Sequence, residues 1–127
     1  MSADPILGAM RAAGAGMGAQ QTRLRLSAEN LSNADTPGYQ RKLVPFRVED
    51  GLVSVGRTRL DETEGERIYD PAHPLADAEG TVTLSNVDMM IELADAREAQ
   101  RSFDANLQVF GQARRLYDGL LSILRRP

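Results

Sequence analysis

The sequence predicts an α+β fold, in which long N- and C-terminal helices form a coiled-coil-like pair that flanks a small β-rich insert. Apolar residues recur at alternating spacings of four and three near both ends of the chain, which is typical of helices that pack against other helices. In the middle of the chain, short runs of β-forming residues alternate with turn residues. We therefore expect a discontinuous helical core domain from residues 1–36 and 86–127, with the insert at residues 37–85.

The N-terminal helix is expected to start with Asp4 as its cap and Pro5 at the first helical position, where the missing N–H costs nothing. It also contains glycines that each cost roughly 1 kcal/mol relative to alanine, so the isolated helix should be marginal. We expect it to become ordered on assembly, with a flexible linker at residues 14–18 as the alternative. The glycines are Gly8, Gly14, Gly16 and Gly18, and the seam is Ile6, Met10, Ala13, Met17, Gln20, Leu24, Ser27 and Leu31.

A turn should end this helix at residues 33–39. Pro37 disfavours the helical conformation for Thr36, and Gly38 permits a positive φ. The run Thr36-Pro37-Gly38-Tyr39 is therefore a predicted tight turn.

Four short strands are predicted in the insert. Asp50 and Gly51 form a favourable hairpin turn between the first two strands. Pro45 has no N–H to donate and confines the first strand to a sheet edge. The predicted strands are residues 43–48, 52–60, 67–69 and 81–84.

The C-terminal helix is expected to start after Ser85 or Asn86, either of which can cap it, and to approach about 55 Å at about 1.5 Å per residue. Asp88 and Glu92 lie near the positive end of its dipole, and two arginines lie near the negative end. Only Gln100 and Arg114 interrupt the apolar character of its seam. The seam is Met89, Leu93, Ala96, Gln100, Phe103, Leu107, Phe110, Arg114, Tyr117, Leu121 and Leu124.

Composition argues against several classes of function. The net charge is −3 with both signs interspersed, which does not favour a nucleic-acid partner. The absence of cysteine excludes disulfides and thiolate chemistry. The N-terminus lacks the basic region of a secretory signal peptide, and no apolar run approaches the roughly 20 residues of a membrane span.

No chemical site is predicted. His73 is the only histidine and has no recognisable catalytic or zinc-binding partners. The glycines at 14–18 lack the context of a phosphate-binding loop, and the acidic stretches at 61–66 and 77–80 lack the spacing of a calcium loop. We expect no catalytic residue, cofactor, metal or small-molecule substrate, and therefore no enzyme.

Two stretches resemble a known family. The run from Asn30 to Tyr39, NLSNADTPGY, resembles the N-terminal signature of the bacterial flagellar rod, hook and hook-associated family. The segment from Tyr69 to Gly80, followed by Ser85-Asn86-Val87-Asp88, is similar to the proximal-rod members of that family, although the turn alone also resembles another rod protein. Ser85 replaces a common proline, and residues 100–106 depart from the usual run.

The resemblance implies a structural subunit of the proximal rod, the drive shaft in the flagellar basal body that crosses the periplasm. It implies self-assembly and packing with other rod proteins through the terminal helices, which transmits torque. It also implies export, unfolded, through the flagellar type III apparatus. The assembly residues expected from the family motifs and the seams are Leu24, Asn30, Leu31, Asn33, Pro37, Gly38, Tyr39, Asn86, Val87, Phe103, Ala105, Asn106, Leu107, Phe110, Arg114, Tyr117 and Leu121.

Three alternatives stay open. The chain could be another rod or hook subunit. It could instead be a peripheral membrane protein that uses residues 117–126 as an interfacial amphipathic helix, because apolar residues there adjoin two arginines. A small hydrolase or isomerase built on the acidic central loops is the third alternative, although no spacing in the sequence demands one.

Overall fold

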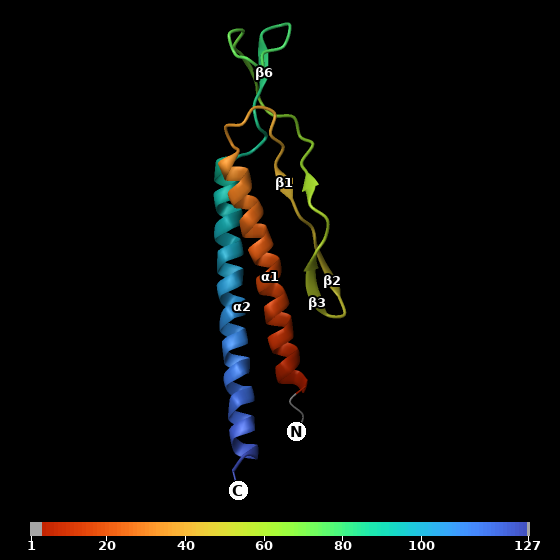
Figure 1. The fold of residues 1–127 in the computed structure, drawn as a ribbon, viewed down its shortest axis with the longest axis vertical. Helices are drawn as coiled ribbons and strands as arrows, with labels where there is room; N and C mark the ends of the chain where they lie inside the picture. Colours follow the sequence, from red (N-terminus) through yellow and green to blue (C-terminus); the bar gives the residue numbers. More distant parts are fainter. Residues whose placement is uncertain (1–3, 127) are drawn as a thin grey trace.

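The computed structural model describes residues 4–126 and has the predicted α+β architecture. Helix α1, Asp4–Ser32, runs antiparallel to helix α2, Met89–Leu124, and the two pack along each other (Figure 1). The start of α1 and the end of α2 therefore lie at the same end of an elongated molecule. Residues 1–3 and 127, which the predicted helical segments include, lie outside the described residues.

Helix α1 is continuous through its glycines, so the alternative of a flexible linker at residues 14–18 is wrong. Gly16 is buried and faces α2, where Asn106 lies directly opposite. A β carbon at this position would lie 2.7 Å from Asn106 Nδ2. The helix therefore needs a glycine here for close approach, although the same residue weakens its intrinsic stability.

Helix α2 is capped two residues after the expected cap at Asn86. The N-cap is Asp88, whose side chain accepts hydrogen bonds from the backbone N–H groups of Met90 and Ile91 at 2.9 and 3.4 Å. Asn86 cannot serve as the cap because its amide is used elsewhere. Its Nδ2 donates to the carbonyl oxygens of Asp61 and Thr63, both at 2.8 Å, and holds the insert against the start of α2.

The insert consists of three separate two-stranded antiparallel sheets. The predicted strands at 43–48 and 52–60 are each split in two. Pro45 breaks the first, and its carbonyl accepts from the N–H of Gly56 at 2.8 Å, where the second breaks. The strand pairs are β1 (Lys42–Leu43) with β4 (Arg59–Leu60), β2 (Phe46–Glu49) with β3 (Leu52–Val55), and β5 (Arg67–Tyr69) with β6 (Thr81–Thr83).

The predicted hairpin turn at Asp50 and Gly51 is confirmed. Both residues have positive φ, 54° and 76°, as a type I′ turn requires. The β2–β3 hairpin lies beside α1. In contrast, β5 and β6 extend beyond the end of the helical pair that is opposite to the chain termini (Figure 1).

The core is thin and follows the line where the helices meet. Its buried apolar residues are mostly small, and three polar residues are buried with them. Leu26 packs on the side of α1 that faces the insert. The buried residues are Ala13, Gly16, Ala19, Leu26, Ala99 and Ala113, with the polar Ser27, Asn30 and Glu92, and in the insert Gly80 and Val82.

The predicted α2 seam is half right as an intramolecular contact. Ala96, Phe103, Phe110 and Tyr117 are half-buried, as expected. Leu93, Gln100, Leu107 and Arg114, which alternate with them, are exposed, and so are Met89 and Leu124 at the ends of the seam. In the structure, the residue immediately before each of the alternate positions faces α1 instead, because its side chain is smaller or makes hydrogen bonds and fits where the helix backbones come close. These residues are Glu92, Ala99, Asn106 and Ala113.

Candidate assembly interface

Asn30 is the hub of a polar cluster where α1, β1 and α2 meet. Its side chain is 1% exposed. Nδ2 donates to the carbonyl of Lys42 at 3.0 Å and to Glu92 Oε1 at 3.2 Å, while Oδ1 accepts from the N–H of Lys42 at 2.9 Å. Tyr39 completes the set by donating its hydroxyl to the same Oδ1 at 2.9 Å. Asn30 therefore acts inside the subunit, tying the end of α1 to the insert.

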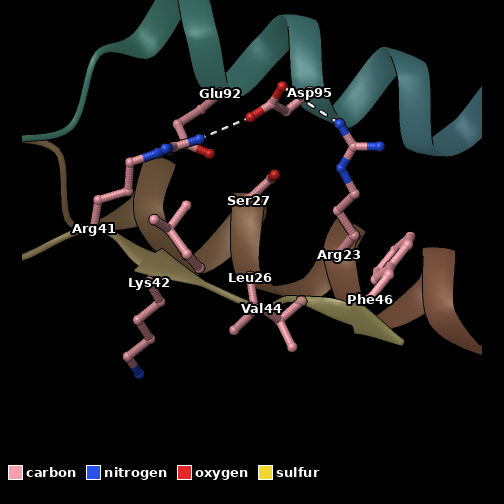
Figure 2. A pocket seen from close by; sticks show the side chains of 10 residues that line it. Arg23, Leu26, Ser27, Arg41, Lys42, Val44, Phe46, Glu92 and Asp95 are labelled. Atoms are coloured by element: carbon pink, nitrogen blue, oxygen red, sulfur yellow. Dashed lines mark hydrogen bonds and ion pairs between the residues drawn. The ribbon is translucent and has the colours of Figure 1, made fainter. Parts of the chain in front are cut away.

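A network of ion pairs lies beside Asn30. Arg41 contacts Glu92 through Nε and Asp95 through a terminal nitrogen at 2.7 Å. Arg23 reaches the other oxygen of Asp95 at 3.5 Å and Glu98 at 3.3 Å. These pairs join α1, the residue before β1, and α2, and Figure 2 shows the connection from Arg41 through Asp95 to Arg23. Partly buried pairs of this kind fix orientation more than they add stability.

The pKa of the Tyr39 hydroxyl is raised above its ordinary value of 10.0. Burial is the main cause, and the negative charges of Glu29 and Glu92 add to it. The neutral phenol, which can donate to Asn30, is therefore the form that this site favours.

The predicted turn after α1 is a compact junction. Asn33 caps the helix end, because its Nδ2 donates to the carbonyl of Glu29 at 2.9 Å and its Oδ1 accepts from Thr36 Oγ1 at 3.3 Å. Gly38 has a φ of 75°, and its N–H donates to the carbonyl of Thr83 at 3.0 Å. The turn thereby connects α1 to the base of the β5–β6 hairpin.

Most of the family-derived residues lie at this junction, whereas Ala105 and Asn106 lie farther along α2. Asn86 accepts from the N–H of Arg41 at 2.6 Å, in addition to its two donated bonds. Pro37, Leu31 and Val87 are half-buried. Ser85, which stands where the family often has proline, donates its hydroxyl to the carbonyl of Ala34.

On α2, the expected assembly residues divide between two faces. Phe103, Asn106, Phe110, Tyr117 and Leu121 are half-buried on the side that meets α1. The other expected residues of α2 are exposed: Leu107 by 51%, the Arg114 side chain by 69%, and Ala105. Leu24 belongs to α1, where it is half-buried in a shallow hollow near Arg25 and Ala28.

A second apolar line on α2 was missed by the sequence analysis. Val109, Leu116 and Ile123 recur every seventh residue and are 51%, 54% and 64% exposed. Testing a second heptad register on the same helix would have found them. This row lies on a side of α2 that α1 does not cover.

Chemical sites are not evident in the described part of the chain. No group of three His, Cys, Asp or Glu residues within 4–126 could hold a metal ion. None of the described helices is long and apolar enough to cross a membrane.

Two family models match the chain. One, described as flagella basal body rod protein, matches residues 10–40, which cover most of α1 and the turn. The other, described as flagellar basal body rod FlgEFG protein C-terminal, matches residues 78–123, from the end of the insert through almost all of α2.

Curated relatives extend this likeness over nearly the whole chain. The flagellar basal-body rod protein FlgC of Agrobacterium fabrum is 43% identical over 135 aligned residues, covering 96% of this chain and 97% of the relative. FlgC of Salmonella typhimurium is 36% identical over 109 residues, which cover 76% of this chain and 81% of the relative. FlgC of Aquifex aeolicus is 32% identical over 124 residues, with 89% and 92% covered.

Proposed function

Because the chain belongs to the FlgC family of flagellar basal-body rod proteins, which are structural subunits of the rod, we propose that it builds the proximal rod and helps the rod to transmit torque. In this role it packs against further copies and other rod proteins through its terminal helices. It performs no enzymatic reaction and needs no cofactor, nucleic acid or small-molecule substrate.

One observation carries the proposal. Helix α2 uses one face for α1 and leaves apolar side chains exposed on both flanks of that face, with Leu107 on one flank and the row Val109, Leu116 and Ile123 on the other. A helix that is apolar on more than one side gains stability only when a second partner covers the remaining face. In a tubular assembly, that partner is a helix of a neighbouring subunit.

The glycines of α1 support the same proposal. A β carbon on Gly8, Gly14 or Gly18 would meet nothing within 4 Å, so nothing in the described chain requires these three glycines. They nevertheless weaken the helix by roughly 1 kcal/mol each. We propose that neighbouring helices approach here in the rod, and that the weak helix becomes ordered on assembly after the subunit is exported unfolded by the flagellar type III apparatus into the periplasm.

Two substitutions test the interface. Leu107→Asp places a charge on the exposed apolar face, and Arg114→Glu reverses a charge beside it. Both should abolish motility and reduce rod-containing basal bodies at least tenfold in a strain that lacks the native gene, while subunit levels stay normal. Gln108→Asp is the matched control, because Gln108 is equally exposed on the same helix. Normal rods in Leu107→Asp would refute the interface.

The membrane alternative has its own discriminating measurement. Ile123 and Leu124 are 64% and 79% exposed beside Arg125 and Arg126, which suits a membrane surface as well as a protein partner. Flotation of the purified chain with anionic liposomes would favour the membrane. Recovery of the chain only with rod components would favour the rod.

A further inference from the structure

Strand β2 has one edge that no other part of the insert covers. On its other side it pairs with β3, and β3 lies between β2 and α1 (Figure 1). All the residues of β2, Phe46–Glu49, are exposed, and two of them are apolar. Phe46 is 40% exposed and Val48 is 74% exposed. The uncovered edge of β2 therefore faces away from the helical pair and carries apolar side chains.

The register of the hairpin shows which backbone groups point outward along this edge. In a two-residue hairpin, the residues that flank the turn exchange hydrogen bonds, and such pairs then alternate with non-bonded pairs along the strands. Glu49 flanks the turn, and at the other end of the hairpin the N–H of Gly56 donates to the carbonyl of Pro45 at 2.8 Å. The N–H and carbonyl groups of Phe46 and Val48 therefore point away from β3, and within residues 4–126 they have no hydrogen-bond partner.

Strand β1 shows how outward-pointing backbone groups are satisfied inside the subunit. The side-chain amide of Asn30 donates to the carbonyl of Lys42 at 3.0 Å and accepts from its N–H at 2.9 Å. This amide takes the place that a peptide group of a neighbouring strand would fill. Strand β2 has no such cover, and an open edge with apolar side chains is a template for pairing with another chain.

The side chains of β2 define what an added strand must carry. Phe46 and Val48 lie on one face and Arg47 and Glu49 on the other, because side chains alternate along a strand. Neither Arg47 nor Glu49 makes an ion pair within residues 4–126. Residues directly opposite each other in paired strands are in contact, and opposite charges there are favourable. A fitting strand therefore places apolar residues opposite the apolar pair, an acidic residue opposite Arg47 and a basic residue opposite Glu49.

We propose that β2 receives a third, antiparallel strand from a rod protein other than this chain. From its N-terminal side, the added strand reads basic, apolar, acidic, apolar. No run of four residues in this chain has that order, so a second copy does not supply the strand. Main-chain hydrogen bonds to Phe46 and Val48 hold the added strand, and its side chains give specificity. This inference rests on the proposed function.

A proline at position 48 tests the main-chain bonds. Because the N–H of Val48 points away from β3, Val48→Pro removes a donor from the open edge and leaves the bonds between β2 and β3 in place. In a strain that lacks the native gene, rod-containing basal bodies should fall at least about tenfold, because the lost bond also leaves a carbonyl of the added strand unpaired.

Thr58→Pro is the matched control for the proline. Thr58 is exposed, lies outside the strands of the insert, and its N–H has no hydrogen-bond partner within residues 4–126. This variant should build normal rods. Circular dichroism of both purified variants checks that the hairpin change has not unfolded the chain. A folded Val48→Pro subunit that builds normal rods would overturn the inference.

Photo-cross-linking identifies the partner and does not depend on the proline variant. The chain carries a small photoreactive diazirine amino acid in place of Val48, and isolated basal bodies are irradiated and analysed by mass spectrometry. The expected adduct joins position 48 to a different rod protein, at a segment that reads basic, apolar, acidic, apolar. The same probe in place of Tyr69, which is 76% exposed on β5, should not give this adduct.

The other outcomes of the cross-linking are decisive as well. Adducts only to second copies of the chain, adducts to a segment without this order of residues, or no adduct in basal bodies that contain the chain would each overturn the inference and leave the rod function intact. Absence of even the native chain from basal bodies would refute the proposed function, and the inference with it.

Discussion

Asn106 on α2 lies against the backbone of Gly16 on α1, so closely that a β carbon on Gly16 would lie 2.7 Å from Asn106 Nδ2 and 2.9 Å from Cγ. Asn106 is held in place by donating to the carbonyl of Ser102 at 3.0 Å. This contact sets the distance between the two helices near the middle of their shared length.

Gly16→Ala should therefore lower the free energy of unfolding by about 1 kcal/mol, because the cost of overpacking exceeds the gain in helix propensity. Gly18→Ala, in open space on the same helix, should raise it by up to about 1 kcal/mol. Urea unfolding followed by circular dichroism measures both. Asn106→Ala should rescue Gly16→Ala, and equal stabilisation by the two alanines would contradict the close contact.

The triple variant Gly8→Ala, Gly14→Ala, Gly18→Ala should separate stability from assembly. All three positions have open space around the missing β carbon, so the isolated chain should gain about 2–3 kcal/mol and more helix. If neighbouring subunits need these glycines, the same variant should lose motility. The readouts are helix content of the purified chain and swimming on soft agar. A stabilised variant that swims normally would exclude a role for these glycines in the rod.

Asn30→Ala should be among the most destabilising substitutions in the chain. It removes four hydrogen bonds and leaves buried groups of Lys42 and Glu92 without a partner. We expect a loss of about 2–4 kcal/mol, since each unsatisfied buried group costs about 1–3 kcal/mol. Thermal unfolding measures the effect. Ser32→Ala, on the exposed end of α1, is the control and should change stability by less than about 0.5 kcal/mol.

Stability should fall in alkali through Tyr39. Its pKa in the folded chain is raised above 10.0, so the neutral phenol contributes stability that is complete below the ordinary pKa and disappears as pH rises through the raised value. Urea unfolding between about pH 8 and pH 11 should show this loss in the wild type and a shallower slope in Tyr39→Phe. Tyr69→Phe, at a residue 76% exposed, should keep the wild-type slope.

Local chemistry in the sequence predicted the local structure well. Asp50 and Gly51 specify their hairpin turn because few other residues adopt positive φ, and Pro37 and Gly38 specify the turn after α1 for related reasons. The cap of α2 was predicted at Ser85 or Asn86 instead of Asp88. Ser, Asn and Asp are all favourable N-cap residues. Asn86 does not cap α2 because its side chain is hydrogen-bonded to the carbonyls of Asp61 and Thr63, which are distant in the sequence.

The sequence by itself determined the two helices, their pairing around an insert, and the likeness to flagellar rod proteins, because these depend on residue periodicity and local motifs. Only the tertiary structure decided which face of each helix is inside. The predicted and observed seams of α2 differ by one residue at Leu93, Gln100, Leu107 and Arg114, and a periodic pattern cannot rank two such registers. The choice depends on close packing at Gly16 and Asn106 and on the hydrogen bonds of Asn30 with Glu92, which join residues far apart in the chain.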